Sequence, residues 1–212
     1  MSPRLVTLAH RLRRADHALL RRSQRARSAP VDRALVNVTR AANYSRLWMA
    51  IAAGLSLFGG ERGRQAARTG ALAVMIAAAV ANGPVKLVAR RRRPRGRPLA
   101  PLIPMPRTTS FPSGHSAAAF AFATGASARL PALAPTLFPL AAGVAYSRIH
   151  VGVHFPSDVL IGSGIGVVAG MAAAQLNPDA CAPAMPAADR RPHPSRRGRN
   201  DVRTDRGAER SL

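Results

Sequence analysis

The chain has 212 residues and one cysteine, and its 32 lysine and arginine residues outnumber 9 aspartate and glutamate residues, for a formal net charge of +23. One cysteine excludes a disulfide framework, and this length suits one domain better than two. The positive charge favours anionic partners: nucleic acid, an anionic membrane surface or a small phosphorylated substrate. The mean hydropathy of −0.02 averages arginine-rich ends with long apolar runs in the middle. We therefore expect membrane-spanning segments between two basic ends.

The first segment, to about Arg27, predicts a basic amphipathic helix. Apolar residues recur at helical spacing with arginines between them, at Leu5, Leu8, Leu12, Ala15 and Leu19. The segment lacks a long uncharged apolar core, so it is neither a normal signal peptide nor a span. We expect this arm, residues 1–30, to lie on anionic lipid headgroups; the alternative is a solvated arm.

Five apolar segments follow and predict an all-α integral membrane helix bundle over residues 31–177. They are residues 47–60, 69–89 and 113–130, a fourth helix that Pro131 and Pro135 open and that runs through Tyr146, and residues 159–176. Residues 178–212, rich in proline, arginine and alanine, are predicted to form a disordered basic tail.

Details of these segments predict how the spans are built. The first is short for a bilayer, because about 20 residues are needed, so we expect its helix to include residues 41–44. Asn82-Gly83-Pro84 predicts a kink in the second. The last segment carries small residues that permit close helix contacts, at Gly162, Gly164, Gly166 and Gly170.

Three polar clusters fall at the ends of the central helices. The first holds Lys86 and Arg93-Pro94, the second is residues 111–115, and the third holds Ser147-Arg148, His154 and Asp158. The second predicted span ends, the third begins and the fourth ends at these points. All three points therefore lie on the same side of the membrane.

The cations of these clusters are suited to a phosphate, which needs positive donors from several directions. Lys86, Arg93 and Arg148 are the candidates. Lys86 is the only lysine in the chain, and an ammonium beside an apolar helix is costly without a partner. Most other arginines, including residues 90–92, are expected to be surface or headgroup contacts.

Ser113-Gly114-His115 has the form of an anion site. Serine caps a helix, glycine lets the backbone approach a ligand, and the first-turn N–H groups point outward. Pro-Ser-Gly is also a common turn, so the other clusters decide between the two readings.

His154 and Asp158 are four residues apart, so one helical turn lets the carboxylate accept from Nδ1 and leaves Nε2 as a nucleophile. The alternative is a helix-capping aspartate beside a loop histidine. Asp158 is the only carboxylate between Arg62 and Pro178, too few for a two-metal phosphatase. A three-histidine metal site at His115, His150 and His154 is a weaker alternative.

Together the clusters resemble the signature of the type 2 phosphatidic acid phosphatase and vanadium haloperoxidase superfamily, in its membrane lipid phosphatase branch. Lys86 with Arg93-Pro94, Pro112-Ser113-Gly114-His115, and Ser147-Arg148 with His154 and Asp158 match its three motifs in order and spacing. The resemblance covers about residues 47–176. Membrane members commonly have six spans, and here the amphipathic N-terminal region stands in place of the first.

The resemblance implies a mechanism without metal or cofactor. His154 attacks phosphorus to give a phosphohistidine, Asp158 orients its ring, and His115 protonates the leaving oxygen. The phosphate-binding groups are Lys86, Arg93, Ser113, Gly114 and Arg148. The implied substrate is a membrane lipid phosphate, either phosphatidate-like or a polyprenyl phosphate or diphosphate, and the sequence does not separate these.

Two alternatives to a lipid phosphatase stay open at this point. One is a vanadate-dependent haloperoxidase of the same fold, which the five apolar spans and compact length disfavour. The other is a non-catalytic basic membrane protein. Nucleic acid is not an expected partner, because the arginine-rich ends lack interleaved aromatic residues. We expect a multi-pass protein of the cell membrane, and the positive-inside rule slightly favours a cytoplasmic site. The sequence does not predict an oligomeric state.

Overall fold

The computed structural model describes residues 3–95 and 100–177, which contain helices and no strand. The tail predicted at residues 178–212 lies outside the described residues. The α-helices are α1 (Pro3–Arg25), α2 (Ala29–Ala41), α3 (Arg46–Phe58), α4 (Gly60–Asn82), α5 (Pro84–Ala89), α6 (Gly114–Arg129), α7 (Ala134–His150) and α8 (Pro156–Leu176), with short 3₁₀ turns at Asn43–Ser45 and Pro131–Leu133. The all-α prediction is confirmed.

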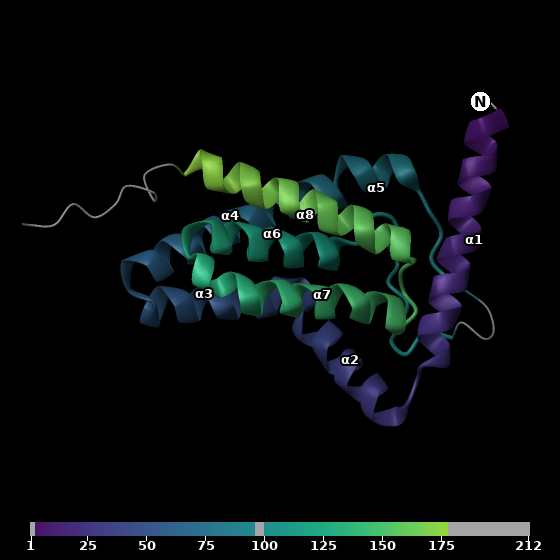
Figure 1. The fold of residues 1–212 in the computed structure, drawn as a ribbon, viewed down its shortest axis with the longest axis horizontal. Helices are drawn as coiled ribbons and strands as arrows, with labels where there is room; N and C mark the ends of the chain where they lie inside the picture. Colours follow the sequence, from purple (N-terminus) through teal and green to yellow (C-terminus); the bar gives the residue numbers. More distant parts are fainter. Residues whose placement is uncertain (1–2, 96–99, 178–212) are drawn as a thin grey trace, which may run out of the picture. The chain divides into compact units, whose positions relative to one another are not determined.

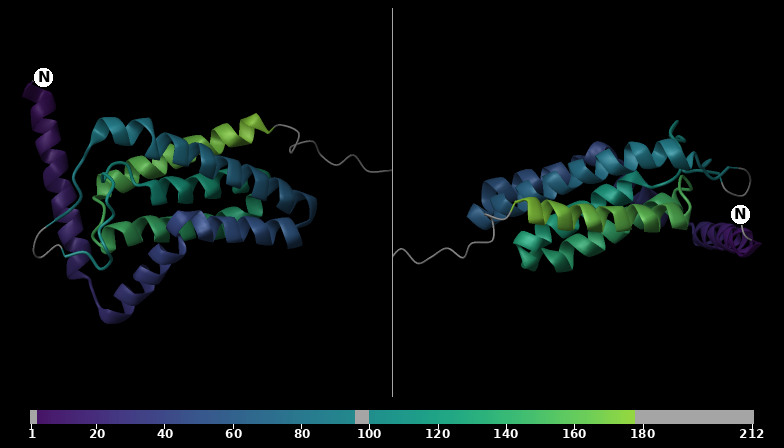
Figure 2. Two further views of the ribbon diagram at one scale, coloured as in Figure 1. Left: turned by 180° about the vertical axis from the view of Figure 1, so that it is seen from behind. Right: turned by 90° about the horizontal axis from the view of Figure 1, so that it is seen from above.

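Helix α6 lies among α3, α4, α7 and α8, which run alongside it in Figures 1 and 2. Its buried side chains are mostly alanines, with Phe122 stacked beside Trp48 of α3 at a ring separation of 5.6 Å. Small side chains let helix backbones approach closely, so alanine is used here where a soluble core would carry leucine. The predicted apolar segments thus form one bundle.

Glycines of α8 make the closest contact with α6. A Cβ at Gly162 would lie 2.5 Å from the Ser113 carbonyl oxygen, and one at Gly166 would clash with the carbonyl oxygen of Ala117. Gly170 packs as tightly against Thr124, whereas Gly164 has open space around it. The prediction of close contacts is confirmed for three of the four glycines and is wrong for Gly164.

The prediction that one unbroken helix runs through residues 41–44 into the first span is wrong. Tyr44 and Ser45 adopt left-handed backbone angles, with φ of 53° and 59°, so α2 and α3 are separate helices. Because such angles stop helix propagation, α3 starts at Arg46 and has 13 residues. The break turns Asn43 toward the site described below.

The kink predicted at Asn82-Gly83-Pro84 is confirmed. Helix α4 ends at Asn82, and α5 begins at Pro84 with Gly83 between them. Proline has no N–H to donate and fixes its own φ, so it starts a helix readily and interrupts one that reaches it. Lys86 therefore lies on a short separate helix.

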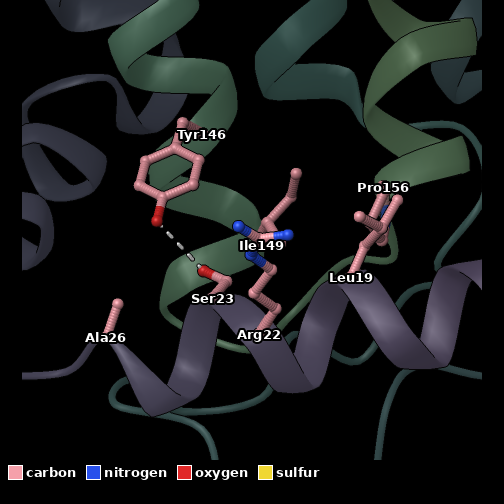
Figure 3. Close-up of a pocket in the computed structure, with 7 residues that line it drawn as sticks. All are labelled: Leu19, Arg22, Ser23, Ala26, Tyr146, Ile149 and Pro156. Carbon is pink, nitrogen blue, oxygen red and sulfur yellow. Dashed lines mark hydrogen bonds between the residues drawn. The ribbon is translucent and has the colours of Figure 1, made fainter.

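Helix α1 runs crosswise to the bundle, at the end where α6 and α8 begin (Figures 1 and 2). Its buried residues are Asp16, Leu20 and Ser23, on one face, and the Ser23 hydroxyl lies 3.3 Å from the Tyr146 hydroxyl of α7. Figure 3 shows this contact beside a cavity of about 360 Å³ between α1 and the bundle. Leu12 and Leu19 lie on the same side of α1 as Asp16 and Ser23, at the walls of cavities between α1 and the bundle, and are about half exposed, at 55% and 53%.

Among the residues that the structure describes, two helical stretches are long and apolar enough to cross a membrane. They are Gly60–Lys86, which includes the kink, and Pro156–Leu176. Helices α6 and α7 have 16 and 17 residues, close to the length that a bilayer requires. The count of five spans therefore stays a prediction.

Candidate active site

The three predicted clusters come together at one end of the bundle. Lys86 lies on α5, Ser113 to His115 lie at the start of α6, and Arg148 lies in the last turn of α7. His154 is in the short loop between α7 and α8, and Asp158 is in the first turn of α8. His115 is close enough to interact electrostatically with four other site residues: Arg148, His154, Arg93 and Lys86.

The imidazole of His154 is almost completely buried, and its Nε2 lies 3.0 Å from Nη1 of Arg93. An arginine only donates, so Nε2 must accept and the ring proton resides on Nδ1. The same Nη1 also donates to the carbonyl oxygen of Val153 at 2.9 Å, which fixes the guanidinium. The neutral ring thus presents a lone pair at Nε2.

Asp158 lies beside the other ring nitrogen, but not at hydrogen-bond distance. The separation from Nδ1 to Oδ2 is 3.7 Å, because Oδ2 accepts from the hydroxyl of Ser110 at 2.5 Å and from the N–H of Phe155 at 2.9 Å. The predicted hydrogen bond is therefore wrong for this structure, although the pairing of the two side chains is present. Asp158 also caps α8 through Phe155, so the two readings of this residue are compatible.

Burial dominates the protonation of the loop residues in the site. Loss of water lowers the pKa of His154 from 6.5 to about 4; Asp158 raises it, while the positive charges of Arg93 and Arg148 lower it further. Burial also lowers the pKa of Arg93, and Asp158 partly offsets this. At neutral pH the histidine is therefore uncharged, as a nucleophile must be.

Arg148 is buried at the end of α7, with 2% of its surface exposed. Its Nη1 donates to the hydroxyl of Thr39 on α2 at 2.5 Å, and Ser147 donates to the same hydroxyl at 3.1 Å. Its Nε has no partner among the described residues. A buried guanidinium N–H without an acceptor is costly, and an anionic ligand oxygen would satisfy it.

Asn82 connects the lysine to the start of α6. Lys86 Nζ donates to Asn82 Oδ1 at 2.8 Å, and a Cβ built on Gly114 would lie 3.0 Å from that oxygen. Ser113 is buried and caps α6 by accepting from the N–H of Ser116. Lys86 and the first turn of α6 therefore lie on either side of the Asn82 side-chain amide. An ammonium and helix N–H groups placed this close together are suited to bind one anion.

His115 lines the open side of the site. Its Nε2 lies 2.9 Å from Oδ1 of Asn43, in the break between α2 and α3. His115 and Arg148 lie at the wall of a cavity of about 390 Å³, whose other lining residues are Arg40, Asn43, Tyr44, Ile103, Pro104 and Pro106. This cavity gives a ligand a route to both residues.

The expectation that residues 90–92 are surface contacts is wrong for Arg91. Its Nη1 donates to Oδ1 of Asp158 at 2.7 Å and its Nη2 to Oδ2 of Asp16 at 2.7 Å. Sequence reasoning also missed the hydroxyls of Ser110 and Thr39. All of these contacts join segments that are far apart in the chain. The chain has many serines, threonines and arginines, and no local sequence pattern marks the ones that make these contacts.

The third histidine of the alternative metal reading has a different partner. His150 Nε2 lies 2.7 Å from Oδ1 of Asp32 on α2. Within residues 3–95 and 100–177, no group of three or more histidine, cysteine, aspartate or glutamate side chains is arranged to hold a metal ion.

A protein-family model matches the part of the chain that contains the whole site. The model of the PAP2 superfamily matches residues 68–180, which is more than half of the chain and includes all eight predicted site residues. The chain belongs to the PAP2 superfamily. The match begins within α4, so α1, α2 and α3 lie outside the part that the family shares.

Curated relatives of this PAP2 chain carry one name. Decaprenylphosphoryl-5-phosphoribose phosphatase of Mycobacterium tuberculosis is 40% identical over 88 residues, which are 41% of this chain and 48% of the relative. The protein of that name from Mycolicibacterium smegmatis is 34% identical over 119 residues, 56% of this chain and 64% of the relative. The chain thus spans about half to two thirds of the length of these relatives.

Two solved PAP2-like structures resemble the fold. LpxE of Aquifex aeolicus superposes with a TM-score of 0.64 at 27% identity, covering 74% of this chain and 93% of that one. The transmembrane PAP2 type phosphatidylglycerolphosphate phosphatase of Bacillus subtilis gives 0.59 at 23% identity, covering 79% and 87%. With the two apolar helices, these neighbours identify a membrane protein.

Proposed function

We propose that this protein is a phosphatase that hydrolyses a membrane lipid phosphate through a phosphohistidine intermediate on His154. The observation that carries the proposal is the state of that ring: buried, neutral at pH 7, with its Nε2 lone pair facing Arg93 and with Arg148 close enough to act on the ring. A neutral nucleophile surrounded by cations is suited to an anionic electrophile, because the cations attract the phosphate without protonating the ring.

In the first step Nε2 of His154 forms a bond to phosphorus as the bond from phosphorus to the leaving oxygen breaks. Nδ1 keeps its proton, and the positive charge that develops on the ring is stabilised by Asp158, 3.7 Å away. His115 gives a proton to the leaving oxygen. Water, deprotonated by His115, then attacks phosphorus, the P–N bond breaks, and inorganic phosphate and free His154 are released.

The phosphate oxygens are bound by groups from α5, the loop after it, the start of α6 and the end of α7: Lys86, Arg93, Ser113, the N–H of Gly114, and Arg148. The Nε of Arg148, which has no partner in residues 3–95 and 100–177, supplies a donor for a phosphate oxygen. Each charge-assisted hydrogen bond contributes about 1.5 to 3 kcal/mol, and bonds that tighten as charge spreads over the oxygens accelerate the reaction.

The cavity lining favours an amphiphilic substrate. Ile103, Pro104 and Pro106 provide apolar surface on the approach to His115 and Arg148. A phosphate can bind at the inner end while a hydrocarbon chain extends past these residues into the bilayer. Since the relatives are named for a decaprenyl-linked phosphate, prenyl phosphates are the first substrates to test, followed by phosphatidate-like lipids.

The proposal includes a multi-pass arrangement in the cell membrane, with α1 on the headgroups. The crosswise helix leaves Leu12 and Leu19 about half exposed, and its arginines are exposed: Arg11, Arg13, Arg14, Arg21 and Arg22. An apolar stripe beside exposed arginines binds anionic membrane surfaces. The positive-inside rule then favours the cytoplasmic side for α1 and the site.

Phosphate release by the detergent-purified chain tests the proposed function. Prenyl phosphates, prenyl diphosphates and phosphatidate are offered in parallel, with His154→Ala as the matched variant. We expect release from at least one lipid phosphate by the parental chain and none by the variant. Equal release by both would overturn the assignment of the nucleophile, and no release by the parental chain would overturn the function.

A further inference from the structure

The carboxylate of Asp158 is held by a residue that belongs to none of the three motifs. Asp158 is fully buried, and besides the two donors on Oδ2 it accepts from Nη1 of Arg91 on Oδ1 at 2.7 Å. The Arg91 guanidinium also lies over the ring of Phe155, 4.3 Å from its centroid. Since both carboxylate oxygens have donors, the plane of the carboxylate is fixed on both sides.

The other prong of Arg91 reaches helix α1. Its Nη2 lies 2.7 Å from Oδ2 of Asp16, so one guanidinium bridges two carboxylates. A planar guanidinium presents two separate N–H prongs at fixed geometry, which a lysine ammonium lacks. Arg91 therefore links Asp16 on α1 to Asp158 on α8 through one rigid guanidinium.

Asp16 is buried, with 5% of its surface exposed, although it lies on a helix rich in arginine. It accepts from the N–H and the hydroxyl of Ser157, at 2.9 and 2.6 Å, in the first turn of α8. It is the only carboxylate among residues 1–31. A carboxylate on an unattached arm would remain in water, whereas this one is bound to the turn that carries Asp158.

We propose that Arg91 and Asp16 are positioning residues for the reaction: Asp16 holds the guanidinium of Arg91, and Arg91 holds Asp158 with Oδ2 toward Nδ1 of His154. This inference rests on the proposed function, because Asp158 acts through His154. Asp16 precedes the part of the chain that the family model matches, so α1 contributes to the site as well as to membrane contact. Neither residue lines the cavity beside His115 and Arg148.

The test compares kcat, KM and inhibition by inorganic phosphate for purified full-length variants. Arg91→Gln is expected to lower kcat about tenfold to a hundredfold, as misplacement of a catalytic group by about 1 Å does, while KM and phosphate inhibition stay at parental values. Arg91→Lys should restore part of the loss, since it keeps the charge and loses one prong. Asp16→Asn should lower kcat less than Arg91→Gln.

A double variant separates positioning from a general loss of structure. If Asp16 acts through Arg91, then Asp16→Asn combined with Arg91→Gln is no slower than Arg91→Gln alone. The matched control is Glu61→Gln, which removes the carboxylate of an exposed ion pair with Arg64 and should leave kcat unchanged.

Three results would overturn the proposal: a parental kcat for Arg91→Gln, multiplication of the two single effects in the double variant, or weaker phosphate inhibition in proportion to the loss of kcat. A parental chain that releases no phosphate would overturn the proposed function and this inference together. An active parental chain with an unchanged kcat in Arg91→Gln would overturn this inference and leave the proposed function standing.

Discussion

At the scale of single residues, the site depends on pairs of side chains that lie far apart in the sequence. Thr39 is buried on α2, and its hydroxyl is the acceptor that orients Arg148 on α7. A buried guanidinium without a fixed acceptor loses both orientation and stability. In the proposed function, the hydroxyl thus holds the arginine in place before the phosphate binds.

Thr39→Val is therefore expected to lower kcat/KM about tenfold, since a hydrogen bond to a charged group contributes about 1.5 to 3 kcal/mol. Steady-state phosphate release measures the effect. Thr136→Val is the control, because the Thr136 hydroxyl is exposed and bonds only to the carbonyl oxygen of Leu133 one turn earlier. Equal rates for the two variants would show that Thr39 does not position Arg148.

The lowered pKa of His154 predicts a window of pH-dependent stability. The folded chain protonates this ring only near pH 4, whereas the unfolded chain does so near 6.5. The unfolded state binds more protons between these values, so this group lowers the free energy of unfolding as pH falls from 6.5 to 4. His154→Gln removes that contribution and should lose less stability over the window. Chemical unfolding in detergent measures both slopes, and parallel slopes would contradict the lowered pKa.

At the scale of elements, one of the close contacts between α6 and α8 places two parts of the site. Gly162 of α8 lies against the backbone of Ser113, so the start of α6 and the first turns of α8 are held together. Glycine is needed where a backbone approaches another at this distance. Packing between α6 and α8 therefore sets the distance between the anion-binding turn and Asp158.

Two other glycines on α8, Gly166 and Gly164, offer a matched comparison of the packing between α6 and α8. Gly166→Ala should destabilise the protein by about 1 to 3 kcal/mol, because its Cβ would clash with α6. Gly164→Ala faces open space and should stabilise α8 by up to about 1 kcal/mol through helix propensity. Melting temperatures in detergent should move in opposite directions. A shift of the same size and sign in both would contradict the packing.

Most elements of this fold could be predicted from sequence because apolar runs, prolines and Asn82-Gly83-Pro84 mark helix boundaries locally. The break at Tyr44 and Ser45 could not, since neither residue favours a left-handed backbone and the contact of Asn43 with His115 spans distant segments. The motifs placed the candidate side chains at one end of the bundle. Their partners on α1 and α2 depend on packing that no local pattern records.

At the scale of the whole molecule, helix α1 and the site lie at the same end of the bundle (Figure 1). Helix α1 lies at the end of the bundle where α8 begins, and α8 has 21 residues, about the thickness of the hydrocarbon core. If α8 spans the membrane, the chain after Leu176 emerges on the side opposite the site.

Cys181, the only cysteine, reports this orientation. With the site facing the cytoplasm, a membrane-impermeant maleimide should label Cys181 in intact cells, and Cys181→Ser should remove the label. Labelling that requires permeabilised cells would place the site on the outer face instead.

The most direct test of the account is to trap phosphate on the protein during turnover. The purified chain is mixed with a lipid phosphate labelled in its phosphoryl group, quenched at alkaline pH, where phosphohistidine survives, and mapped by mass spectrometry. The account predicts label on His154 in the parental chain and none in His154→Ala. Turnover without label on His154, or label that persists in His154→Ala, would contradict it.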